Sequence, residues 1–202
     1  VWRFQAHGAF LHSPAFEAGL VVAASVDGRV YAVNATDGKL VWHSQDYVGG
    51  FSASPVLEAG RVFLGTRGGA FLAFQLSDGS VAWRQDLAVP IRQTAAAVDG
   101  KVFVTAEDLR VRCFSLDGAP LWTSPPLRGQ TARDYYPVIV QAGGRTRVIV
   151  RTNPTVDMAR RIGSDRQMLA RQAGADDSDW RKLDAWIKSD AARGDATLWA
   201  RE

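Results

Sequence analysis

Short apolar segments separated by glycine-bearing turns run through the first three quarters of the chain. Between Ser13 and His43 they read SPAFE, LVVAAS, RVYAV and KLVWH, and each is rich in Val, Leu, Phe, Tyr or Trp. Asp-Gly and related pairs between such segments favour tight hairpins, because both residues tolerate positive φ. The pattern predicts four short strands in an antiparallel meander.

The same unit recurs along the chain. Asp-Gly pairs stand at 37–38, 78–79 and 117–118, and tryptophans stand at 42, 83 and 122; both series step by 41 and then 39 residues. Matched steps in two unrelated residue types indicate one structural unit that was copied. The predicted units are 13–43, 54–84, 94–123 and the start of a further unit at 135–152.

A period of about 40 residues with four strands per unit is typical of a β-propeller blade, since a lone four-stranded sheet cannot bury both of its faces. We therefore predict an all-β propeller of four-stranded antiparallel blades, with about three and a half blades in residues 1–152. Closed propellers use roughly four to eight blades. We expect an incomplete ring, with further blades downstream.

The Asp-Gly turn of each unit and the tryptophan that follows it are expected to form the contact between neighbouring blades. Each indole is best placed to pack either against the adjoining blade or against its own turn. Val1-Trp2 lies 40 residues before Val41-Trp42, so residues 1–12 are predicted to form a closing or preceding outer strand. The predicted structural docking residues are Gly38, Trp42, Gly79, Trp83, Gly118 and Trp122.

The composition changes in residues 153–202, where Ala, Arg, Asp, Gln and Met replace the β-branched residues. Met158, Ile162 and Leu169 share one helical face, and Asp176–Ala192 has the pattern of a second amphipathic helix. This predicts a helical insertion or appendage. Packing on the propeller rim and presentation to a partner both remain open.

Charge and composition exclude several classes. The net charge is only +3 and no basic run occurs, which argues against nucleic acid because phosphate binding needs clustered cations. No apolar run has the 18 or more residues of a membrane-spanning helix. The first residues do not read as a secretory signal. Cys113 is the single cysteine, so no disulfide can form within the chain.

Candidate binding residues are sought in the loops between blades, because function concentrates on loops held by rigid sheets. These loops are 44–53, 85–93 and 124–136, and the candidate ligand-binding residues are Arg92, Arg133, Asp134 and Tyr135. The alternative is that these side chains are solvated or pair with each other. No catalytic or metal-ligating residues are predicted, since His7 and His12 read as surface residues and the acids in hairpin turns read as turn chemistry.

Ala32–Trp42, read AVNATDGKLVW, resembles the tryptophan-docking repeat A-x-D-x-x-T-G-x-x-x-W of PQQ-like (quinoprotein dehydrogenase-like) propellers. The second copy keeps Ala73, Gly79 and Trp83, while the third has Cys113 in the alanine position and is one residue short. The resemblance covers about residues 1–152.

The resemblance implies an exported bacterial protein, periplasmic or at the cell surface, and a family with two branches. Some members are pyrroloquinoline-quinone dehydrogenases that hold calcium, often with a vicinal disulfide that a single cysteine cannot form. Others, such as those of the outer-membrane β-barrel assembly machinery, bind no quinone and act as scaffolds. We therefore predict a non-enzymatic scaffold without cofactor, binding a protein or small ligand through inter-blade loops and central channel. The alternatives are a PQQ-dependent dehydrogenase whose quinone and calcium ligands lie in blades outside this segment, and a hydrolase that uses the propeller only as scaffold.

Overall fold

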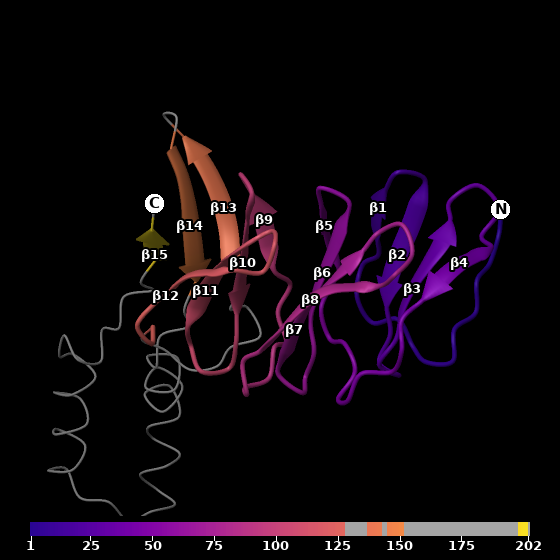
Figure 1. Cartoon of the computed structure of the whole chain (residues 1–202), viewed down its shortest axis with the longest axis horizontal. Coiled ribbons are helices and arrows are strands. Elements are labelled where there is room, and N and C mark those ends of the chain that lie inside the picture. The colour runs from indigo at the N-terminus through magenta and orange to yellow at the C-terminus, as the bar shows by residue number, and fades with distance from the viewer. Residues whose placement is uncertain (128–136, 143–144, 152–197, 202) are drawn as a thin grey trace, which may run out of the picture.

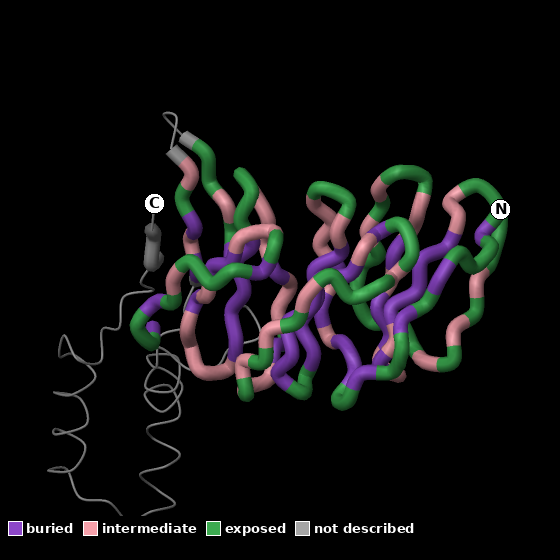
Figure 2. Tube along the Cα trace, viewed as in Figure 1, coloured by how far each residue is buried: buried purple, intermediate pink, exposed green. Residues whose placement is uncertain are grey.

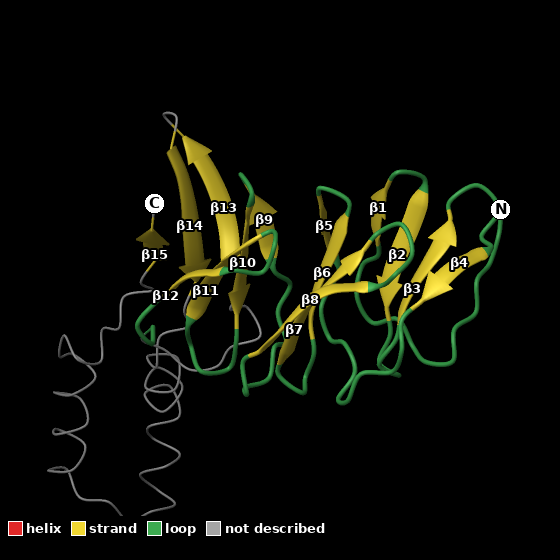
Figure 3. Ribbon diagram, viewed as in Figure 1, coloured by secondary structure: helices red, strands yellow, loops and turns green. Residues whose placement is uncertain are grey.

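The computed structural model describes residues 1–127, 137–142, 145–151 and 198–201, and these ranges contain strands and turns but no helix (Figure 3). Four antiparallel sheets lie side by side in chain order, with the first and fourth at opposite ends of the row (Figure 1). The predicted all-β propeller architecture is confirmed.

Three sheets have four strands each, paired in sequence order. The first consists of β1 (Ala15–Glu17), β2 (Leu20–Ala24), β3 (Val30–Asn34) and β4 (Leu40–His43). The second consists of β5 (Val56–Glu58), β6 (Arg61–Gly65), β7 (Ala70–Gln75) and β8 (Val81–Asp86). The third consists of β9 (Ala96–Val98), β10 (Lys101–Thr105), β11 (Val111–Ser115) and β12 (Pro120–Thr123).

In the first three sheets the hairpin between the first two strands is a two-residue turn with both residues at positive φ. In the first sheet Ala18 has φ 49° and Gly19 has φ 78°, and Glu17 pairs with Leu20 across the turn. The pairs Ala59-Gly60 and Asp99-Gly100 repeat this geometry. Such turns match the twist of the flanking strands, so these dipeptides set the register of each sheet.

The hairpin before the outermost strand carries the repeat motif. Ala32 pairs directly with Trp42, and the register shifts by one residue immediately afterwards. Ala73 with Trp83 and Cys113 with Trp122 show the same pairing and the same shift. The small residue opposite each indole is fully buried in all three sheets, which explains why cysteine substitutes for alanine in the third.

The core consists of three apolar clusters, one between each pair of neighbouring sheets. Buried residues follow the middle strands and exposed ones the turns and outer strands (Figure 2). The cluster between the first and second sheets includes Val22, Trp42, Phe51 and Phe74, none of them more than 8% exposed. Side chains that alternate along β6 and β7 therefore bury both faces of the inner strands of the second sheet.

The fourth sheet has three described strands, namely β13 (Pro137–Ala142), β14 (Arg145–Arg151) and β15 (Leu198–Arg201). The range 153–202, assigned from the sequence to a helical insertion or appendage, includes a strand at Leu198–Arg201 that pairs with β14. Val150 pairs with Trp199, a partner so distant in sequence that no local pattern identifies it. The two helices predicted within 153–192 lie outside the described residues.

Residues 1–12, predicted to form an outer strand, contain no strand in the structure. The first sheet already has four strands, β1 to β4, and this segment pairs with none of them. It instead crosses the first sheet, where the Phe4 and Phe10 rings lie 5.6 and 5.8 Å from the ring of Tyr31. The Ala9 carbonyl accepts hydrogen bonds from the Val26 N–H and the Ser25 hydroxyl.

Candidate functional site

The tryptophans of the first two outer strands lie on a glycine of the next blade. A Cβ atom added to Gly79 would stand 2.4 Å from Cε3 of Trp42, so only glycine allows this approach of the ring to the backbone. Gly79 also has φ +71°, which favours glycine independently. The Trp42 Nε1–H donates to the Leu76 carbonyl at 2.8 Å. The indole is thus held on one face by packing and at one edge by a hydrogen bond.

The same contact recurs along the chain. Trp83 packs on Gly118 and donates to the Leu116 carbonyl at 2.7 Å. Trp2 packs on Gly38 and donates to the Ala35 carbonyl at 2.8 Å, although it belongs to no strand. Of the two placements left open by the sequence, the structure places these three indoles on the following blade. Trp122 packs against Phe103, with ring centroids 6.0 Å apart, in the cluster next to the fourth sheet.

The loop between the second and third sheets carries Arg92, the one predicted ligand-binding residue that the structure describes. Its Nε forms an ion pair with Glu107 Oε1 in the β10–β11 turn. The two side chains are 51% and 36% exposed, so the guanidinium remains accessible from solvent. Arg133, Asp134 and Tyr135 lie outside the described residues.

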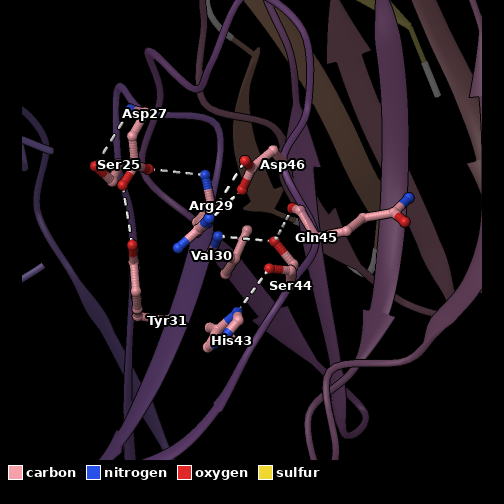
Figure 4. Close-up of polar contacts among 9 residues, drawn as sticks. All are labelled: Ser25, Asp27, Arg29, Val30, Tyr31, His43, Ser44, Gln45 and Asp46. Atoms are coloured by element: carbon pink, nitrogen blue, oxygen red, sulfur yellow. Dashed lines mark hydrogen bonds and ion pairs between the residues drawn. The ribbon is translucent and has the colours of Figure 1, made fainter. Parts of the chain in front are cut away.

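A polar cluster at the β2–β3 turn was not expected from the sequence (Figure 4). Asp27 accepts hydrogen bonds from the Arg29 N–H and the Tyr31 hydroxyl, both at 2.9 Å. Burial alone would raise the pKa of Asp27, but these hydrogen bonds outweigh it and hold the pKa below its ordinary value of 3.8. Burial, aided by the bond to Asp27, raises the pKa of the Tyr31 phenol. The Arg29 guanidinium forms an ion pair with Asp46.

The third blade repeats this arrangement with an arginine, Arg112, in place of the tyrosine. Asp108 accepts from the Arg110 N–H at 3.3 Å and from both terminal nitrogens of Arg112. Burial opposes ionisation, but the Arg112 hydrogen bonds hold the pKa of Asp108 below its ordinary value. The second blade has Gly68 in the corresponding position. In the sequence these aspartates read only as turn residues, because their side-chain partners lie on the strand that follows.

The described residues show no cluster of the side chains that most often hold metal ions. Within residues 1–127 and the described part of the fourth sheet, no three His, Cys, Asp or Glu side chains come together as possible metal ligands. Cys113 is buried in the third sheet. The absence of a cofactor stays a prediction.

An aromatic groove of about 220 Å³ lies on the outer face of the first sheet. Trp2, Phe4 and Phe10 of the N-terminal segment form one side, and Tyr31 with the alternating apolar residues of β2 and β3 forms the floor. Among the lining residues only Trp2, His12 and Tyr31 have polar side-chain atoms, and the Trp2 Nε1–H and the Tyr31 hydroxyl already donate to Ala35 and Asp27. The groove is suited to apolar surface rather than to a polar ligand.

Four-stranded antiparallel sheets in a row, each joined to the next by a buried apolar cluster, define a β-propeller built of PQQ-like repeats. The family model described as outer membrane protein assembly factor BamB matches residues 1–50 and 46–174. The chain belongs to this family.

Solved structures agree with this fold. The chain is similar to BamB from Moraxella catarrhalis, with a TM-score of 0.61 and 17% identity over 74% of this chain and 45% of that one. It is similar to the computationally designed Ika4 protein, with a TM-score of 0.59 and 14% identity over 75% and 90% of the two chains. It is also similar to the quinohemoprotein alcohol dehydrogenase from Comamonas testosteroni, with a TM-score of 0.54 and 14% identity over 69% of this chain and 31% of that one. No curated protein matches the sequence significantly.

These structural similarities establish the fold but not an activity. The chain spans less than half the length of the BamB structure and about a third of the alcohol dehydrogenase. At such identities the same architecture hosts both a named assembly factor and redox enzymes, so function must be argued from the site.

Proposed function

We propose that this chain is a non-catalytic propeller scaffold that binds a protein partner in the assembly of outer membrane proteins. The observation that carries the proposal is the family match, which extends over residues 1–174 and bears the description of an outer membrane protein assembly factor. A propeller suits this role because its rigid sheets hold several loops in one plane.

The proposed binding surface is the end of the sheets that carries the inter-blade loops and the β2–β3, β6–β7 and β10–β11 turns. Val48 in the first such loop is 89% exposed. Arg67 of the β6–β7 turn donates to the Gly49 carbonyl of the same loop, and Arg92 lies in the second loop. Charged groups here are paired at the surface, as in Arg29 with Asp46. Exposed pairs of this kind contribute more to the choice and orientation of a partner than to affinity.

We further propose an exported protein, periplasmic or outer-membrane associated, as the family description suggests. Among the described residues, no helix has the length and apolarity needed to cross a membrane.

Photo-crosslinking tests the scaffold proposal. A photoreactive phenylalanine analogue replaces Val48 in one exported variant and Asp78, in the turn at the opposite end of the sheets, in a matched control. We expect the Val48 variant, expressed in a Gram-negative bacterium, to form an adduct with a component of the outer-membrane protein insertion machinery. Adducts from both positions, or from neither, would refute the assignment of the partner to the loop end.

The second candidate is a PQQ-dependent dehydrogenase whose quinone and calcium ligands lie in other blades. Its support is the similarity of the fold to a quinohemoprotein alcohol dehydrogenase and to a europium-containing methanol dehydrogenase. Incubation of the purified protein with the quinone and calcium, followed by gel filtration and absorbance, separates the two. A retained chromophore favours the dehydrogenase, and its loss on filtration favours the scaffold.

A further inference from the structure

Two inter-blade loops are held by the same backbone contact but carry different charges beside it. In the third blade the Glu107 N–H donates to the Pro90 carbonyl of the preceding loop at 3.0 Å. In the second blade the Arg67 N–H donates to the Gly50 carbonyl at 3.1 Å. Arg67 therefore occupies in the β6–β7 turn the position that Glu107 occupies in the β10–β11 turn. An arginine stands where the next blade has an acid.

The loop residue near this position differs as well. Ile91 and Phe51 each donate a backbone N–H to the residue that directly follows the second strand of the preceding blade. The residues that follow them, Arg92 and Ser52, are therefore equivalent. Arg92 pairs with Glu107, whereas Ser52 has no charge and its buried hydroxyl oxygen has no hydrogen-bond partner among the described residues. The contact between the first and second sheets thus has a positive charge without the opposite charge that balances it in the next contact.

The Arg67 side chain is exposed, and its guanidinium is only partly used. Its Nε donates to the Gly49 carbonyl. Within the described part of the chain no carboxylate forms an ion pair with Arg67, unlike Arg29 and Arg92 at the same end of the sheets. The two terminal nitrogens of Arg67 therefore remain available, and their planar geometry suits a carboxylate bound through both of its oxygens.

The apolar neighbour of this guanidinium is Val48, which is 89% exposed. Loop and turn pack backbone against backbone, since a Cβ atom added to Gly68 would stand 2.7 Å from the Val48 carbonyl oxygen. A Cβ atom added to Gly49 would stand 3.2 Å from the Cβ of Arg67. A partner therefore meets a surface that is already formed, which reduces the entropy cost of binding.

We propose that Arg67 and Val48 together recognise an acidic segment of a protein partner. A carboxylate of that segment binds the terminal nitrogens of Arg67, and a neighbouring apolar side chain packs on Val48. The partner is acidic because the unbalanced charge on this surface is positive, and complementary charge orients and selects a partner. The inference rests on the proposed function, since it names the chemistry of the contact at the loop end.

Photo-crosslinking from position 48 measures the contribution of Arg67. Arg67→Glu is introduced into the variant that carries the photoreactive residue in place of Val48, and Arg84→Glu is introduced into a matched control. Arg84 lies on the outer strand β8 and is 51% exposed, and the change in charge is the same. Arg67→Glu should reduce the adduct by about tenfold or more, because it places like charges opposite each other, whereas Arg84→Glu should leave it unchanged. Circular dichroism shows whether both variants remain folded.

A charge exchange then tests the carboxylate itself. Mass spectrometry of the adduct identifies the partner segment, which should contain Asp or Glu close to the crosslinked position. Changing that acid to arginine should abolish the adduct with unaltered Arg67 and restore it with Arg67→Glu. Only a direct contact between the two charges gives this reciprocal result.

The outcomes separate this inference from the scaffold proposal. An adduct that Arg67→Glu leaves undiminished, equal losses with Arg67→Glu and Arg84→Glu, or a partner segment without an acid would each overturn the role of Arg67 and leave the scaffold proposal intact. The absence of any adduct with unaltered Arg67, or an adduct with a lipid, would instead refute the protein-binding function and this inference with it.

Discussion

Replacing Gly79 by alanine should separate two physical causes that both favour glycine beneath Trp42. The first is backbone strain, because Gly79 has φ +71°, which costs an L-residue about 1 kcal/mol. The second is the indole, since the new methyl group would stand 2.4 Å from Cε3 and 2.7 Å from Cδ2. The ring must then move, which loses about 1 kcal/mol with the Leu76 hydrogen bond and about 1–2 kcal/mol of packing. We expect a total destabilisation of about 3–4 kcal/mol.

Gly60→Ala is the matched control. Gly60 has φ +70°, almost identical to Gly79, yet a Cβ atom there would meet nothing within 4 Å. Only the strain of about 1 kcal/mol should remain. Urea denaturation followed by far-UV circular dichroism and tryptophan fluorescence measures both variants. Equal losses of stability would show that the indole contributes nothing to the requirement for glycine, and the proposed joint between blades would be wrong.

Three further variants test other contacts. Because hydrogen bonds hold the folded-state pKa of Asp27 below 3.8, its ionised form stabilises the fold above that pH, and this stabilisation is lost as the pH falls through the folded value. Tyr31→Phe removes one of these bonds, so the variant should be less stable than the wild type at neutral pH and should lose less stability as the pH falls. Urea midpoints of the two proteins that change in parallel across that pH range would contradict this. Trp83→Phe removes the donor to the Leu116 carbonyl and should cost about 1 kcal/mol, measured by the urea midpoint; no change would mean that water replaces the bond without loss. Arg92→Ala breaks a solvent-exposed ion pair and should cost less than about 1 kcal/mol of stability while reducing crosslinking from Val48, and a large loss of stability would instead make Arg92 a structural residue.

The strands and turns of the first three blades could be predicted because the information is local. The glycines of Ala18-Gly19 and its two counterparts mark where the chain reverses, and alternation along the following strands assigns each side chain to a face. The recurrence of Gly and Trp at a fixed separation then identifies one unit copied along the chain. None of this requires knowledge of what lies across the sheet.

The candidate site was predicted only in part. Arg92 was predicted to bind a ligand from its place in an inter-blade loop, and that role stays a prediction; its pairing with Glu107, which joins an inter-blade loop to the β10–β11 turn, could not be predicted. The bond from Tyr31 to Asp27 was missed, although the residues are only four apart. An aspartate before glycine is common in a tight turn, so the sequence gives no reason to look for a further role of Asp27. The sequence also does not show that the Tyr31 side chain points back towards Asp27.

The amino-acid sequence by itself determined the repeat, the turn geometry and the apolar faces, because each depends on neighbours within a few residues. Only the tertiary structure decided that Trp42 lies on the next blade, that Leu198–Arg201 joins β14, and that the outer face of the first sheet retains a groove. These features join segments separated by tens of residues, and their stability comes from surfaces that meet only after each sheet has formed.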